Sequence, residues 1–191
     1  VINTNGLLIP EQFVNHDLED PTDSDPLNGE LIMSGGTINA RWMNLGQLKG
    51  NGSATLSGDA VINLASNVPG NPANGGHLEF NRNWFLDGLP VPSSGNVSLD
   101  ISDSAVINIH GHRSQSLSIP DQSEVDRYQG YIDAGQLTAW GGTATPVVTL
   151  ENNMITIRAP EIPGDYNADG TVNAADRAGW RGRRGEKSEL N

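Results

Sequence analysis

The sequence ATLSGDAVIN at residues 54–63 has the pattern of a short strand, a tight turn and a second short strand. Two other stretches repeat it, LIMSGGTIN at residues 31–39 and LDISDSAVIN at residues 99–108. Each stretch has alternating aliphatic residues, a serine followed by glycine or aspartate, and a final Ile-Asn. Aliphatic residues with a period of two favour strands, and glycine and aspartate favour tight turns. The three stretches therefore predict repeated strand-turn-strand units.

The spacing of the three final asparagines predicts how the units are arranged. Asn39, Asn63 and Asn108 lie 24 and 45 positions apart, which fits one and two turns of a coil of about 22 residues. We therefore expect an all-β protein whose body is a β-solenoid of the right-handed β-helix kind, with a skipped coil at residues 77–86. In such a coil, equivalent strands stack and equivalent asparagines form hydrogen-bonded columns. The alternative is a β-sandwich or jelly roll, whose hairpins use the same turn residues.

The chain before and after the repeats predicts further elements. Residues 1–10 are a strand candidate, and the acidic segment that follows is a solvated loop or a second calcium site. We treat residues 1–27 as an N-terminal strand and acidic loop, which packs on its own domain or serves as an assembly arm. Residues 28–159 are the strand-rich body. Residues 160–191 are a linker, a calcium loop with a helix, and a basic tail.

One short helix and one hairpin are expected near the end of the body. Residues 124–134 have helical spacing of apolar side chains, with Ser123 as the N-cap and Gly135 as the stop. A helix here would cover the open end of a solenoid, which needs a cap. Residues 147–158 alternate around Glu-Asn-Asn and predict a hairpin.

The stretch DYNADGTVNAAD at residues 165–176 has the spacing of a calcium loop. Calcium prefers six to eight oxygen ligands, and a glycine at the sixth position, here Gly170, permits the sharp turn of such a loop. The ligand positions 1, 3, 5, 7, 9 and 12 are occupied by Asp165, Asn167, Asp169, Thr171, Asn173 and Asp176. Thr171 would contribute its backbone carbonyl. The sequence therefore predicts Ca²⁺ as the cofactor.

Residues 164–180, GDYNADGTVNAADRAGW, resemble one repeat of a type I dockerin, the calcium-binding module by which secreted bacterial proteins dock onto cohesin domains. The aspartate at position 12 and the absence of an entering helix match that family. A dockerin has two such repeats, whereas this chain has one, so the resemblance covers half a module. Residues 28–158 resemble the Gly/Asn/Thr-rich solenoid repeats of secreted bacterial surface proteins. These resemblances imply calcium binding, an extracellular location, and a cohesin-like protein or a polysaccharide as an alternative partner.

Composition narrows the class of protein. The formal net charge is −12, which disfavours binding to nucleic acid and to anionic membranes. Five of the 11 basic residues lie at positions 177–187, where they could face the acidic body of a neighbouring copy. The chain has no cysteine, no run of transmembrane length, and a start at Val1 that is typical of a processed product. We expect a secreted protein at the cell surface.

Catalytic candidates are few. Asp100 and Asp103 flank a repeat turn, and His110 and His112 follow as alternate residues that could share a face. Polar residues at an exposed corner of the coil explain them better, because no further partner is identifiable. The tryptophans and tyrosines could form a sugar-binding platform, although packing in the core explains most of them. We therefore expect a non-catalytic, calcium-binding structural protein that forms homo-oligomers, a filament, a tube or a layer.

Overall fold

The structure is a computed structural model of the 191-residue chain. It describes residues 2–4, 7–9, 28–47, 50–65, 76–82, 84–86, 89–91, 95–112, 119–162, 165, 171, 172, 174 and 176. The named elements in this part of the chain are 15 strands and one helix. The prediction of an all-β protein with one short helix in its body is confirmed.

The first sheet has six strands in the order β1, β4, β7, β12, β15 and β14. β1, β4, β7 and β12 pair in parallel, whereas β15 is antiparallel to both β12 and β14. The bounds are β1 (Ile2–Thr4), β4 (Thr37–Ala40), β7 (Val61–Leu64), β12 (Val106–Ile109), β14 (Val147–Glu151) and β15 (Met154–Arg158).

Two further parallel sheets lie beside the first, and a small hairpin is separate from them. The second sheet has the order β2, β5 and β8, and the third has the order β13, β11, β6 and β3. The bounds are β2 (Leu7–Ile9), β3 (Asn28–Met33), β5 (Trp42–Gln47), β6 (Asn51–Leu56), β8 (His77–Arg82), β11 (Val97–Ile101) and β13 (Leu137–Ala139). The hairpin consists of β9 (Trp84–Leu86) and β10 (Leu89–Val91), which pair antiparallel.

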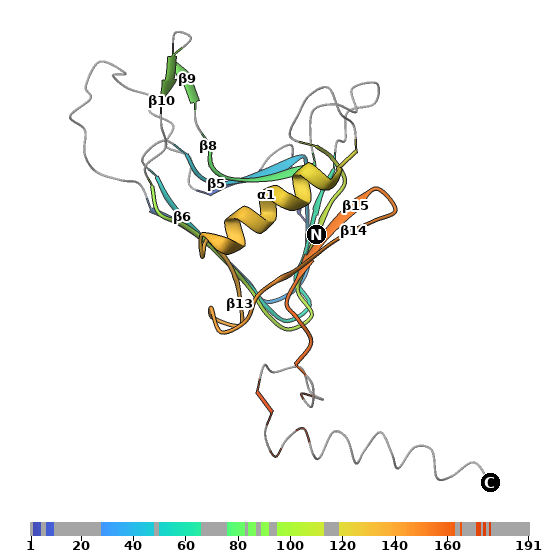
Figure 1. The fold of residues 1–191 in the computed structure, drawn as a ribbon. Helices are drawn as coiled ribbons and strands as arrows, with labels where there is room; N and C mark the ends of the chain where they lie inside the picture. The colour runs from blue at the N-terminus through green and yellow to red at the C-terminus, as the bar shows by residue number, and fades with distance from the viewer. Residues whose placement is uncertain are drawn as a thin grey trace.

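The chain visits the first, second and third sheets in a fixed cycle. β1, β2 and β3 belong to the first, second and third sheets, and β4, β5 and β6 follow in the same order. β7, β8 and β11 make the third round, with the β9–β10 hairpin between the last two, and β12 returns to the first sheet. Figure 1 shows strands of successive rounds lying over one another on three sides. The sheets do not join into one closed sheet.

The three sequence repeats stack in register, as their alignment predicts. Leu31 and Leu99 both pair with Ala54, at equivalent places in the three units. Asn39 and Asn108 both pair with Asn63. The Asn63 side chain donates to Asn39 Oδ1 at 2.8 Å, and the Asn108 side chain donates to Asn63 Oδ1 at 2.9 Å. The predicted asparagine column is therefore confirmed.

The core lies between the three sheets. Period two turns every second side chain inward, so residues in register form buried columns of the same kind. One column contains Ile38, Ile62 and Ile107, with exposed fractions of 5%, 0% and 0%. Fully burying a Leu or Ile side chain stabilises a protein by about 1.5–3 kcal/mol. The other buried aliphatic residues of these strands include Met43, Leu45, Leu56, Leu64, Leu78, Leu99, Ile101, Ile109 and Leu137.

The expectation of a skipped coil at residues 77–86 is wrong. Asn108 pairs directly with Asn63, so residues 63–108 make a single round of the three sheets. Within this round, β8 supplies the strand of the second sheet, and the β9–β10 hairpin lies between β8 and β11. The spacing of 45 residues therefore comes from extra chain within one round.

The N-terminal strand candidate forms two strands. β1 pairs in parallel with β4, and β2 pairs in parallel with β5. Asn3 pairs with Asn39, so it occupies the next position in register with the asparagine column. The triplet Val-Ile-Asn at residues 1–3 also stands at residues 61–63 and 106–108, and it is the sequence signal for this strand. Both N-terminal strands therefore pack on their own chain.

The predicted helix is α1 (Gln122–Asp133), and its N-cap differs from the expected one. Asp121 is the cap, because its Oδ1 accepts from the Ser123 backbone nitrogen at 2.9 Å and from the Ser123 hydroxyl at 2.6 Å. Ser123, the expected cap, lies in the first turn. Gly135, the expected stop, has a left-handed φ of +68° just after the helix.

The predicted hairpin is confirmed as β14 and β15. Glu151 pairs with Met154, which leaves Asn152 and Asn153 as a two-residue turn with φ of 51° and 61°. Two left-handed residues form the turn that best matches the twist of a hairpin, and asparagine tolerates this conformation. Because β15 is antiparallel to β12, the parallel order of the first sheet ends here.

Candidate calcium loop and the adjoining hollow

Of the six predicted calcium ligands, the structure describes three. Asp165 is half-buried, and its backbone nitrogen donates to the carbonyl of Ile162 at 3.0 Å. Thr171 is exposed. Asp176 has a helical backbone conformation, and it is only 2% exposed. Asn167, Asp169 and Asn173 lie outside the described residues.

The donor chemistry fits calcium. A carboxylate that is 2% exposed, as Asp176 is, must be compensated by a cation or by hydrogen bonds, because burying an uncompensated charge is costly. Calcium takes carboxylate, amide and backbone oxygens, and the loop sequence offers all three. Within the described residues, no group of three or more His, Cys, Asp or Glu side chains is placed to hold a metal. The calcium site therefore remains a prediction from the spacing of the loop.

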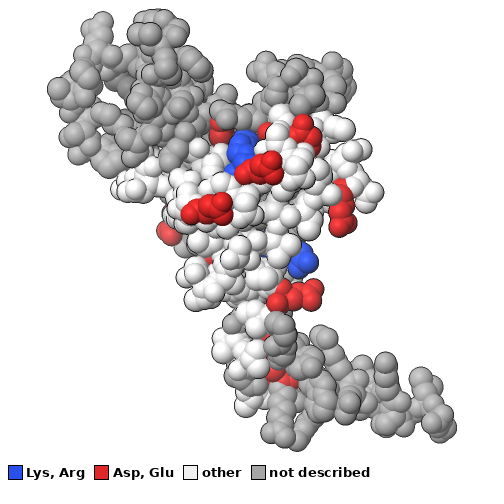
Figure 2. All heavy atoms as spheres, in the orientation of Figure 1, with Lys and Arg blue, Asp and Glu red and all other residues white. Residues whose placement is uncertain are grey.

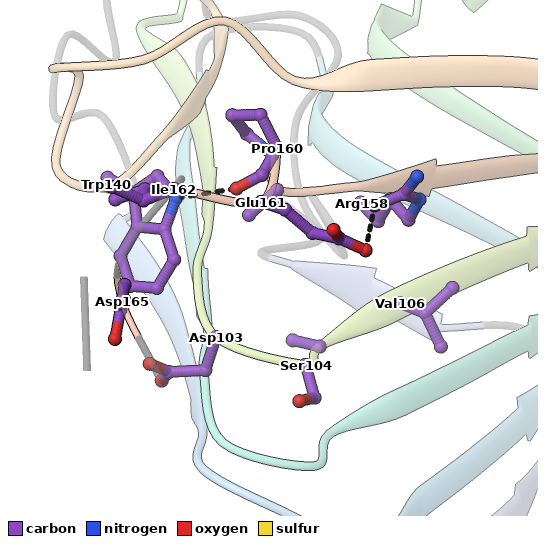
Figure 3. Close-up of a pocket in the computed structure, with 11 residues that line it drawn as sticks. Asp103, Ser104, Val106, Trp140, Arg158, Pro160, Glu161, Ile162 and Asp165 are labelled. Carbon is purple, nitrogen blue, oxygen red and sulfur yellow. Dashed lines mark hydrogen bonds and ion pairs between the residues drawn. The ribbon is translucent and has the colours of Figure 1, made fainter. Parts of the chain in front are cut away.

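Asp165 also lines a hollow of about 520 Å³ between the connector and the strand body. Figure 3 shows its position below the ring of Trp140, close to Asp103. Glu161 and Arg158 line another side of the same hollow. The lining residues come from the turn of the third repeat, the turn after β13, and the segment after β15. Because these segments are far apart in the sequence, no single sequence motif predicts the hollow.

Trp140 has a well-defined place at the edge of the hollow. Its indole nitrogen donates to the carbonyl of Pro160 at 3.2 Å, and its backbone nitrogen donates to the carbonyl of Ile101 at 3.2 Å. Its backbone is left-handed, with φ of 55°, and Gly141 and Gly142 follow with φ of 65° and 82°. A bulky residue with positive φ is an outlier that L-amino acids avoid on steric grounds.

The hollow is acidic. Asp103, Glu161 and Asp165 line it together with one basic residue, Arg158. Arg158 Nη1 lies 4.0 Å from Glu161 Oε1, and the two side chains are 44% and 94% exposed, so this pair contributes little to stability. Figure 2 shows that carboxylates outnumber basic side chains on the described part of the face it displays.

The four polar residues that were considered as catalytic candidates have different environments. Asp100 accepts from the Thr138 hydroxyl at 2.8 Å and from the Gly141 backbone nitrogen at 3.0 Å. Asp103 accepts from the Gly58 backbone nitrogen at 2.7 Å. His110 is exposed, whereas His112 is 7% exposed. Both aspartates therefore hold turns of neighbouring units together, and the two histidines have different environments.

The His112 side chain contacts acidic and hydroxyl groups at the N-terminal end of α1. Its Nε2 lies 3.3 Å from Ser123 Oγ, 3.5 Å from Asp121 Oδ1 and 3.6 Å from Glu124 Oε1. The Ser123 hydroxyl donates to Asp121, and this hydrogen bond lowers the pKa of the Asp121 carboxyl below its ordinary value. The described contacts of the Nε2 atom are thus with one serine hydroxyl and two carboxylates.

Among the described residues, the aromatic side chains do not gather on one surface. Tyr128 is fully buried, and Tyr131 stacks on Phe80 with ring centroids 4.4 Å apart. Trp42 is half-buried on β5, away from the lining of the hollow. Trp140 is the aromatic residue that lines the hollow. The side chains of Trp84 and Trp180 lie outside the described set.

Sequence reasoning missed a second asparagine column on the third sheet. The Asn51 side chain donates to Asn28 Oδ1 at 2.9 Å, and the Asn96 backbone nitrogen donates to Asn51 Oδ1 at 2.7 Å. These asparagines are 23 and 45 positions apart. The asparagines of the first column are 24 and 45 positions apart. These intervals are nearly the same, so the spacing could have predicted the second column.

Comparison of the chain with known family models, with curated proteins and with solved structures gave no match. None of the described helices has the length and apolar character that crossing a membrane requires.

Proposed function

We propose that this chain is a non-catalytic, extracellular structural protein with a β-solenoid body and a calcium-stabilised C-terminal unit. The observation that carries the proposal is the pairing of equivalent repeats, in which Asn39, Asn63 and Asn108 join in one hydrogen-bonded column. Stacking of equivalent units at nearest-neighbour distance is the organising contact of repeat proteins.

The pairing pattern favours a solenoid over a sandwich. Sandwiches are built from antiparallel sheets, whereas β4, β7 and β12 are parallel neighbours, and so are β3, β6 and β11. The cyclic visit to three sheets is the path of a coil with three sides. The antiparallel pair of β14 and β15 and the helix α1 would then close one end of the coil.

A structural role is supported by how the polar groups are used. Asp100 and Asp103 accept hydrogen bonds across units, and Asp121 caps a helix. Each of these carboxylates accepts a hydrogen bond from a backbone N–H group. Such bonds hold the fold together, as a structural role requires. The strand-rich body would present surfaces, and the calcium loop would fix the chain after residue 162.

The assembly part of the proposal draws on the edges of the sheets. β1, β2 and β3 are the outer strands at one end of the first, second and third sheets. Outer strands carry backbone groups that can pair with another chain. Ile32 on β3 is 69% exposed, which adds apolar surface at this edge. A second copy of the chain is the partner we propose.

Calcium binding is tested by thermal unfolding with calcium and with a chelator. Binding to the folded state alone raises stability by about 2.7 kcal/mol when free calcium is 100 times the dissociation constant, so the melting temperature should rise. Asp176→Asn should abolish this response. Glu151→Gln, at the exposed end of β14, is the matched control and should keep it. Equal melting temperatures with calcium and with chelator would reject the calcium proposal.

Assembly is tested separately by light scattering in millimolar calcium. The proposal expects particles larger than one chain, with size increasing with protein concentration. A monodisperse monomer across the concentration range would contradict it. Replacing Ile32 with lysine should reduce association, because a charge on an edge strand disfavours pairing with another edge.

A further inference from the structure

We propose that the hollow beside Trp140 binds a neutral sugar ring. Its volume of about 520 Å³ lies in the range of about 300–1,000 Å³ that is usual for small-molecule sites. It combines one aromatic ring with several hydrogen-bonding groups, which is the usual composition of such sites. This inference does not depend on assembly. It shares one residue with the predicted calcium loop, because Asp165 lines the hollow.

The backbone of Trp140 has an unfavourable conformation. Four non-glycine residues in the described chain have positive φ, and two of them, Asn152 and Asn153, form a hairpin turn. The other two, Asp103 and Trp140, both line the hollow. Aspartate tolerates this conformation, whereas for a bulky residue such as tryptophan it is unfavourable and rare. Unfavourable backbone conformations concentrate at binding sites, so a tryptophan at this position calls for a functional reason.

The ring of Trp140 is held in one orientation at the hollow. The hydrogen bond from the indole nitrogen to Pro160 fixes the ring at the edge of the hollow. In Figure 3 the ring stands above Asp165, with Asp103 nearby. A sugar ring has an apolar face of C–H groups and a rim of hydroxyl groups. Its face would pack on Trp140, and its hydroxyl groups would donate to the carboxylates, which accept hydrogen bonds only.

The net negative charge of the lining residues favours neutral sugars over anionic ones. Three carboxylates and one guanidinium, those of Asp103, Glu161, Asp165 and Arg158, leave the hollow negative. Uronates and sulfated sugars would place like charges beside these carboxylates. Neutral sugars carry no such penalty and have many hydroxyl donors. We therefore infer that neutral glycans are the ligand class and that anionic glycans are excluded.

The test is a titration of the full chain with neutral oligosaccharides of glucose, xylose, mannose and N-acetylglucosamine, and with oligogalacturonate. Tryptophan fluorescence and calorimetry are the measurements. Saturable binding of at least one neutral oligosaccharide at millimolar concentration or below is expected, and none of oligogalacturonate. No response to any neutral oligosaccharide, or equal binding of oligogalacturonate, would overturn the proposal.

Two variants and one control locate the site. Trp140→Asn removes the ring and suits a left-handed backbone, so it should weaken binding by at least about tenfold, which corresponds to about 1.4 kcal/mol. Glu161→Gln should weaken it several-fold, and the Glu161 side chain is 94% exposed, so the fold should be unaffected. Trp42→Phe, outside the hollow, should bind as the wild type does. Wild-type binding by a folded Trp140→Asn variant would refute the assignment.

Discussion

The hydroxyl oxygen of Tyr128 accepts a hydrogen bond of 3.3 Å from the backbone nitrogen of Leu78. Leu78 lies on β8, the outer strand of the second sheet, and Tyr128 lies on α1. Tyr131, one turn later, accepts from the Phe80 backbone nitrogen at 3.4 Å. Two helical tyrosines thus satisfy alternate N–H groups of an outer strand, where the next strand of a sheet would otherwise do so. Figure 1 shows α1 beside this sheet.

Tyr128→Phe should lower the free energy of unfolding by about 1–3 kcal/mol, because it leaves a buried N–H group without an acceptor. Tyr128 is fully buried, and its hydroxyl also contacts Arg127 and Glu124 at 3.2 and 3.4 Å. Urea unfolding measures the loss, and amide exchange at Leu78 should become faster. Tyr131→Phe is the control with the weaker contact, and it should cost less. An equal or larger loss for Tyr131→Phe would contradict this account.

Alkaline pH should destabilise the protein through the same tyrosine. Burial raises the pKa of the Tyr128 phenol above its ordinary value of 10.0. In the unfolded chain the phenol loses its proton at the ordinary value, whereas the folded protein retains it. The contribution of this group to stability is therefore complete below pH 10.0 and decreases as pH rises further. Urea midpoints measured across this range should fall more steeply for the wild type than for Tyr128→Phe. Parallel curves would argue against the assignment.

Gly58 should be intolerant of a side chain, and Gly135 offers a matched comparison. Both have left-handed φ, of +57° and +68°. A Cβ at Gly58 would collide with the carbonyl oxygen of Ser34 in the preceding unit, whereas a Cβ at Gly135 would meet nothing within 4 Å. Gly135→Ala should cost about 1–2 kcal/mol for the backbone conformation alone. Gly58→Ala should cost clearly more, and similar losses in thermal unfolding would rule out the steric contact between units.

Asn63 should contribute more to stability than Asn108. Asn63 donates to Asn39 and accepts from Asn108, whereas the described contact of the Asn108 side chain is the single bond to Asn63. Asn63→Ala removes both hydrogen bonds, and each net hydrogen bond contributes about 0.5–1.5 kcal/mol. Asn108→Ala removes one. Chemical denaturation of the two variants should show the larger loss for Asn63→Ala, and the reverse order would show that the column does not stabilise the stack.

The repeats could be predicted because their signal is local. Each unit contains its own strands and turn, and the position of its asparagine is fixed by the register that buries the aliphatic residues. The count of rounds failed between Asn63 and Asn108, because inserted chain and a hairpin add residues without adding a round. Sequence spacing measures chain length, and it equals the number of rounds only where connections are of constant length.

The cap and the hollow show two other limits. Asp121 and Ser123 are both good capping residues, and only the geometry reveals that the aspartate accepts from the serine. The hollow is formed by segments near residues 103, 140 and 161, which meet only after the stack has formed. Its strongest sign, the left-handed backbone of Trp140, is a conformational property that sequence does not report.

The reversal of chain direction at β15 gives the molecule two unlike ends. At one end the outer strands β1, β2 and β3 belong to parallel sheets, whereas at the other end an antiparallel hairpin and a helix follow the last parallel strands. Two copies that join through their β1–β3 ends would each cover the outer strands of the other. No outer parallel strands of that end would then be left for a third chain, so the complex would be a dimer. A longer polymer would then require a second contact on a side face, so the stoichiometry of the particles reports which surface holds them together.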